Sequence, residues 1–221
     1  MTGFLLFVAV ALPSWALNSP LPLVAYVMGV LLLGAWRNRG GQHLVLYRQI
    51  RPIMVVQCLG VLVCIAAVVA ALLSLGNPIL DFSWFGLLLQ RTGDTSTALT
   101  GPGGGPAGGN VLIEPLAYHW LALPFIALLF YLLPQLAMAE EQLFRRGTRN
   151  WVQGVYRSVA FGLAHLPMGI PLGAALALSI GGLWFTYQYF RGGVARSATH
   201  HLTYNVIALC VIVVLVLVPL P

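Results

Sequence analysis

Seven apolar stretches, joined by short polar segments, constrain this chain more than any other feature of its sequence. Their approximate ranges are 4–17, 21–36, 52–76, 114–139, 153–167, 171–190 and 197–219. About 20 apolar residues cross a bilayer as a helix, and most of these stretches have or approach that length. In lipid, only helices and closed barrels satisfy the backbone hydrogen bonds. We therefore expect an all-α, polytopic membrane bundle of about six to seven, or at most eight, transmembrane helices.

The composition supports a single membrane domain. Of 221 residues, 59% are hydrophobic and 7% are charged, whereas a soluble domain carries about a quarter charged residues. We expect residues 1–221 to form one integral membrane domain. Residues 1–110 would supply N-terminal helices and a Gly-rich loop, and 111–221 the helices with the candidate site. Stretch 4–17 is short for a span and is predicted to be a short or broken first helix.

The arginines predict the orientation of the bundle. All 11 basic residues are arginines, and ten of them fall in alternate connections between apolar stretches. Positive residues concentrate on the cytoplasmic side of membrane proteins, so these connections should be cytoplasmic. This explanation leaves no need for a nucleic-acid partner. The ten are Arg37, Arg39, Arg48, Arg51, Arg145, Arg146, Arg149, Arg157, Arg191 and Arg196.

A few strongly polar residues lie inside or at the edge of the apolar stretches. Counted from the nearest arginine, their depths are about 7–14 Å at 1.5 Å per helical residue. Polar groups in hydrocarbon are expensive and usually functional, so three helices with polar residues at one depth indicate a shared site beneath the cytoplasmic face. The residues are Glu140 and Glu141, His165, His201, and Asn205.

Helical spacing suggests separate roles for the two glutamates. Glu141 and Arg145 are four residues apart and can pair on one helix face. Glu140 is turned about 100° away and is free to act as a general base. His201 and Asn205 are also four apart, and their side chains suit an oxyanion site. Each residue taken alone also fits a structural role, as a helix end, a packing histidine or an interhelical hydrogen bond.

Three short motifs on these stretches resemble those of a known family. AEEQLFRRG (139–147), FGLAH (161–165) and HLTYN (201–205) resemble the EExxxR, FxxxH and HxxxN motifs of the CAAX protease and bacteriocin-processing family, also called the CPBP or Abi family. Type II CAAX prenyl endopeptidases belong to it. The resemblance covers about residues 115–215.

The resemblance implies a glutamate-dependent intramembrane endopeptidase. Glu140 would activate the attacking water with His165 as its partner, and His201 with Asn205 would bind the oxyanion. Glu141 and Arg145 would support the site. Arg146 departs from the family pattern, in which Gly often follows the motif arginine directly, and His200 has no motif role.

Other functions remain open at this level. A zinc-dependent peptidase is the nearest rival, although no HExxH motif occurs and no cofactor is otherwise expected. A serine or cysteine peptidase lacks its motif. A non-catalytic scaffold, a bacteriocin-immunity or regulatory protein and a transporter are further alternatives. The composition suggests a bacterial plasma membrane. A peptidase there would act on a peptide leader, a bacteriocin or a membrane protein, with its site toward the cytoplasm.

Overall fold

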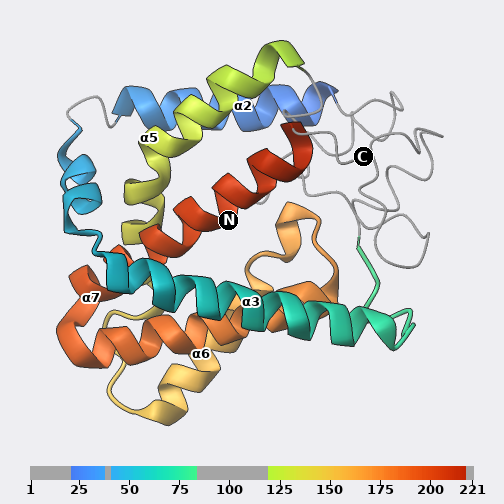
Figure 1. The fold of residues 1–221 in the computed structure, drawn as a ribbon, viewed down its shortest axis with the longest axis vertical. Helices are drawn as coiled ribbons and strands as arrows, with labels where there is room; N and C mark the ends of the chain where they lie inside the picture. The colour runs from blue at the N-terminus through green and yellow to red at the C-terminus, as the bar shows by residue number, and fades with distance from the viewer. Residues whose placement is uncertain (1–20, 38–40, 84–118, 218–221) are drawn as a thin grey trace.

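The computed structural model describes residues 21–37, 41–83 and 119–217, and all the regular structure in these ranges is helical. Figure 1 shows the arrangement of the helices. In chain order they are α2 (Leu21–Arg37), η1 (Gln42–Gln49), α3 (Pro52–Ser74), α5 (His119–Phe144), α6 (Trp151–Leu163), η4 (Leu166–Met168) and α7 (Leu172–Leu217).

Helix α7 forms the centre of the bundle, and α3, α5 and α6 all pack against it (Figure 1). Most of its buried apolar side chains belong to two clusters. One cluster, around Phe161 and Phe185, joins α3 and α6 mainly to the first part of α7. The other, around Leu133 and Leu202, joins η1 and α5 to the second part. A site near the middle of α7 is therefore reached from both α5 and α6.

A sharp bend divides α7 into two parts, 172–191 and 194–217. Gly192 has φ −170° and ψ 23°, and Gly193 has φ 71° and ψ −169°. The positive φ of Gly193 is open almost only to glycine. The two parts then run in different directions, as Figure 1 shows at the left of the view. Arg196 Nε donates to Gln188 Oε1 at 2.9 Å across the bend, so side chains as well as backbone fix the turn.

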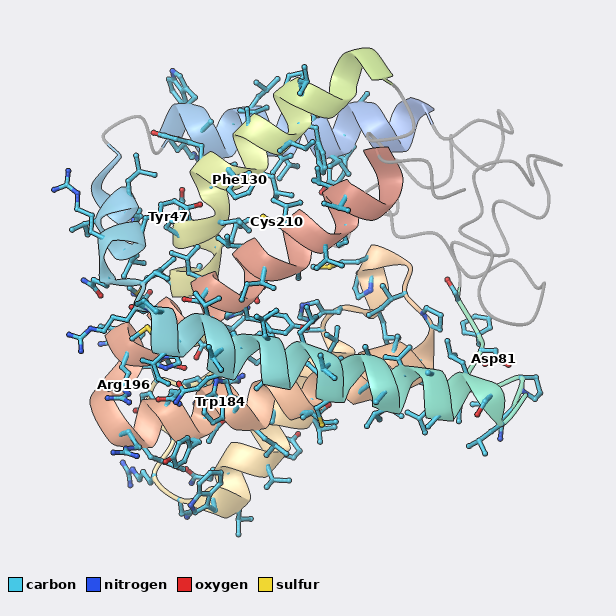
Figure 2. The ribbon with its side chains drawn as sticks, in the orientation of Figure 1. Tyr47, Asp81, Phe130, Trp184, Arg196 and Cys210 are labelled. Atoms are coloured by element: carbon cyan, nitrogen blue, oxygen red, sulfur yellow. The ribbon has the colours of Figure 1, made fainter. Side chains whose placement is uncertain are left out.

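Helix α5 contains two interior prolines, Pro124 and Pro134. Proline has no N–H, so the carbonyl four residues earlier loses its helical partner. For Pro134 that carbonyl belongs to Phe130, and it accepts a hydrogen bond from the Tyr47 hydroxyl of η1 (Figure 2). Burial raises the pKa of Tyr47 to about 12, which keeps the hydroxyl a donor. This contact attaches η1 to the middle of α5.

Small residues allow α6 and α7 to approach closely. Gly154, Ser158 and Gly162 are spaced four apart on α6, and all three are buried. A Cβ atom on Gly162 would lie 2.2 Å from the carbonyl oxygen of Ala175, and one on Gly154 would lie 2.6 Å from Thr186. Small residues at four-residue spacing are typical of helix contacts in membranes. The packing holds the end of α6 firmly against α7.

Three helices of the described chain are long and apolar enough to cross a membrane. They are the α3 stretch Pro52–Ser74, the α5 stretch Leu123–Phe144 and the α7 stretch Leu172–Val214. This is consistent with a membrane protein, but the number is smaller than the six to seven spans predicted from the sequence.

The difference in number has identifiable causes. Stretch 4–17 lies outside the described residues. The helix in 21–36 has only 17 residues. The helix in 153–167 ends at Leu163. The 3-10 turn Leu166–Met168 follows, and Pro167 within it cannot continue an α-helix. The last two stretches are continuous across the bend of α7.

Candidate active site

Glu141, in the last turn of α5, is fully buried and has three polar partners. His201 Nδ1 lies 2.9 Å from its Oε1, and Arg145 Nε lies 3.6 Å from its Oε2. The Ser197 hydroxyl, which also reaches the carbonyl of Phe185, donates to Oε2 as well. The predicted pairing of Glu141 with Arg145 is confirmed. A buried carboxylate without partners would be costly, so Glu141 acts as an anchor between α5 and α7.

Glu140 is the more accessible glutamate, with 30% of its side chain exposed. Its Oε2 lies 3.5 Å from His201 Nε2. The imidazole of His201, itself buried, therefore lies between two carboxylates, with one at each ring nitrogen. Because Nδ1–H donates to Glu141, the ring orientation is fixed and Nε2 is directed toward Glu140.

Aromatic rings enclose this group of polar side chains. The Phe185 ring stacks on His201 with centroids 4.4 Å apart and an interplanar angle of 18°. The Phe161 ring meets His201 edge-on at 5.4 Å, and the Arg145 guanidinium lies 4.9 Å from the centroid of Phe161. No nitrogen of that guanidinium has a hydrogen-bond partner among the described residues. Its charge is balanced instead by Glu141 and by the aromatic face.

His165 lies at the end of α6 and is half-buried. Its Nδ1 lies 2.8 Å from the carbonyl oxygen of Phe161, so Nδ1–H donates there and Nε2 is left as the free ring nitrogen. Its ring meets Phe161 edge-on at 4.8 Å. The structure does not bring His165 into an ion pair with Glu140 or Glu141. The side chain of Phe161, which contacts both histidines, connects it to the rest of the group.

Asn205 lies one helical turn after His201, as the spacing predicts, and is half-buried. Its side chain makes no hydrogen bond to another residue in the described part of the chain. His200 faces a different neighbour. Its Nδ1 donates to the carbonyl of Arg196 at 2.9 Å, and its ring packs against Trp184 at 6.1 Å. His200 is therefore buried away from the two glutamates.

Two contributors to the site were not singled out from the sequence: Ser197 and Phe185. Ser197 precedes His201 by four residues, so helical spacing would have identified it. Phe185 has no such signal. It lies before the bend of α7, and only the bend brings its ring onto His201.

In the described part of the chain, no three His, Cys, Asp or Glu side chains are grouped to hold a metal. The alternative zinc-dependent peptidase therefore has no ligand set there. Two cavities are relevant to ligand binding. One, of about 520 Å³, is largely apolar and lies beside Trp184, and the other, of about 540 Å³, is lined by arginines. Neither is lined by Glu140, His165, His201 or Asn205.

No protein-family model, curated protein or solved structure matches this chain. Only the geometry of the polar group and the resemblance of its motifs therefore bear on the function of the protein.

Proposed function

We propose that this protein is an intramembrane endopeptidase that hydrolyses a peptide bond with water activated by Glu140. One observation carries the proposal. A partly exposed carboxylate lies 3.5 Å from a histidine nitrogen, and a fully buried glutamate holds that histidine in place. A general base needs access to water together with a fixed neighbour, and Glu140 has both.

The proposed reaction follows from these positions. Glu140 takes a proton from water as the water oxygen attacks the scissile carbonyl carbon. The carbonyl oxygen then carries the negative charge of the tetrahedral intermediate. When the C–N bond breaks, the proton held by Glu140 passes to the leaving amine. No covalent enzyme intermediate forms.

His201 and Asn205 are proposed to stabilise the oxyanion. Nδ1–H of His201 is committed to Glu141, so Nε2 donates to an oxyanion only when the ring carries a second proton. Asn205 contributes an amide that is not engaged by other described side chains, and amide donors suit this role.

His165 is proposed to orient the attacking water. Its Nδ1–H is held by the carbonyl of Phe161, which leaves Nε2 to accept a hydrogen bond from water. A water molecule between His165 and Glu140 would complete the pair that the family motifs imply.

The wider setting is part of the same proposal. The chain would form six to seven spans in a bacterial plasma membrane. The arginine-rich connections would face the cytoplasm and place the site just beneath that surface. The substrate would be a peptide leader, a bacteriocin or another membrane protein, as the resemblance to the CAAX protease and bacteriocin-processing family suggests.

The decisive test compares peptides released from membranes that carry the wild-type protein, Glu140→Gln or Gln142→Ala. Gln142 is exposed on the same helical turn and serves as the matched control. We expect the wild type and the control to yield the same products. Glu140→Gln should reduce those products at least about 100-fold, since a positioned general base contributes 10²–10⁴ in rate. Unchanged products from Glu140→Gln would exclude the mechanism.

A non-catalytic role is the second candidate, and the burial of Glu141, Arg145 and His201 as one group that joins α5 to α7 favours it. A scaffold or immunity protein would use Glu141, Arg145 and His201 only to hold the bundle together. In that case a bacteriocin-immunity or interaction phenotype would survive Glu140→Gln, and no variant would change the released peptides.

A further inference from the structure

The arginine-lined cavity lies where η1, the start of α3 and the bend of α7 meet. Its volume is about 540 Å³, and its polar lining includes Arg48, Arg51 and Arg196. The Thr199 hydroxyl of α7 donates to Gln49 Oε1 of η1 at 3.1 Å. This bond links two walls of the cavity, so the cleft is part of the packed fold.

The positive charge of this cleft is not neutralised within the described protein. Arg48, Arg51 and Arg196 form no ion pair with any described carboxylate. Both glutamates of α5 are already engaged with the candidate active site. Asp81 lies at the opposite edge of the molecule from Arg196 (Figure 2). Three arginines that share one concave surface attract an anion, and guanidinium groups match phosphate oxygens in charge and geometry.

An apolar surface begins beside the same cleft. Met54 lines the cavity. Its chain neighbour Ile53, which is 60% exposed, begins a separate exposed apolar face of α3 that includes Val56 and Val63, 65% and 67% exposed. A ligand that fits both surfaces has a phosphate at one end and hydrocarbon chains at the other. Free phosphate would use only the arginines.

We propose that this cleft binds the headgroup phosphate of an anionic phospholipid, with its acyl chains along the exposed face of α3. Basic pockets at the cytoplasmic ends of membrane helices suit such headgroups. The inference rests on the membrane setting of the apolar helices and does not depend on the proposed peptidase activity.

The test uses the full chain in a neutral detergent, with lipid binding measured by native mass spectrometry. Phosphatidylglycerol is titrated against phosphatidylcholine with the same acyl chains, and inorganic phosphate serves as a competitor. The cleft variant carries Arg48→Gln, Arg51→Gln and Arg196→Gln. The control carries the same change at three arginines outside the cleft lining: Arg37, Arg146 and Arg149, all exposed.

We expect the wild type and the control to prefer phosphatidylglycerol at least about tenfold. The cleft variant should lose this preference, and its affinity for phosphatidylglycerol should fall on the order of 100-fold for three arginines. Arg51→Gln alone should weaken binding about fivefold. Its side chain makes no hydrogen bond within the described structure, so this variant tests the site even if the triple variant unfolds.

Three results would overturn the proposal. The first is equal preference for phosphatidylglycerol in the cleft variant and the wild type. The second is an equal loss in the control, which would indicate diffuse attraction to the whole positive end. The third is displacement of phosphatidylglycerol by millimolar inorganic phosphate, which would identify the ligand as free phosphate.

Discussion

At the scale of single residues, two adjacent glutamates have very different surroundings. Glu141 is fully buried with Arg145 and His201 beside it, whereas Glu140 is partly exposed and, among the described residues, has only His201 within ion-pair distance. Removing one partner of a buried ion pair leaves an uncompensated charge. Glu140 should therefore matter for chemistry and Glu141 for folding.

This contrast predicts opposite effects of two matched substitutions. Glu141→Gln should lower the free energy of unfolding by about 3–5 kcal/mol, because Arg145 would remain buried without its counter-ion. Glu140→Gln should lower it by less than about 1 kcal/mol. Denaturant-induced unfolding in detergent, followed by tryptophan fluorescence, measures both. Equal losses would mean that Glu140 is also structural and that its loss of activity is uninformative.

Tyr47 provides a second prediction at this scale. Tyr47→Phe leaves the Phe130 carbonyl, freed by Pro134, without its donor and should lower the free energy of unfolding by about 1–3 kcal/mol. Burial raises the pKa of Tyr47 from 10.0 to about 12. Its contribution to stability is therefore complete below pH 10 and is lost as the pH rises toward 12. The difference in stability between wild type and Tyr47→Phe should shrink over that range, and a constant difference would contradict the assignment.

At the scale of secondary-structure elements, the bend in α7 determines which side chains meet. Phe185 lies before the bend, and Ser197 and His201 lie after it. The bend brings the Phe185 ring onto His201 and the Phe185 carbonyl to the Ser197 hydroxyl. Gly193 adopts φ 71° there, and a Cβ atom at this position would contact nothing within 4 Å. A substitution at Gly193 therefore tests backbone conformation without altering side-chain packing.

Gly193→Ala should lower the free energy of unfolding by about 1–3 kcal/mol, the usual cost of a strained backbone conformation. Gly60→Ala is the matched control, because Gly60 lies in the regular helix α3 and also has open space around it. Alanine there should be neutral or stabilise by up to about 1 kcal/mol. Thermal unfolding of both variants in the same detergent distinguishes them. Similar values for the two would show that the bend does not depend on Gly193.

At the scale of the whole molecule, charge is distributed unevenly between the two ends. Figure 2 places Arg196 at one edge and Asp81 at the opposite edge. The loop after α5 lies near the end of α7's first part, because the backbone N–H of Gly147 donates to the Tyr189 hydroxyl at 3.2 Å. In the proposed orientation, which follows the positive-inside rule, this end would face the cytoplasm.

Cysteine labelling from each side of the membrane tests that orientation. Cysteine is introduced at Arg149 or Asp81, both exposed, after Cys64 and Cys210, the two exposed native cysteines, are replaced by serine. We expect Arg149→Cys to react with an impermeant maleimide only in inverted vesicles and Asp81→Cys only in intact cells. The reverse result would place the candidate site near the outer surface.

Several features were predictable because they depend on local chemistry alone. The length and apolarity of residues 52–76 and 114–139 predicted α3 and α5, since each long apolar stretch must satisfy its backbone hydrogen bonds within itself. The four-residue spacing likewise predicted the pairing of Glu141 with Arg145. The end of α6 was misjudged by four residues, because apolarity was weighed above the effect of Pro167 on the helix.

The sequence by itself determined an all-helical, strongly apolar chain with its polar residues near the ends of α5 and α6 and near the middle of α7. Only the tertiary structure decided how those residues meet. It placed His201 between both glutamates, left His165 in contact with Phe161 but in no ion pair with either glutamate, and left Asn205 without a hydrogen-bond partner among the described residues. The physical reason is that helix packing and the bend of α7 set the distances between helices. Spacing along one helix defines a shared face, but it does not specify which neighbouring helix that face contacts.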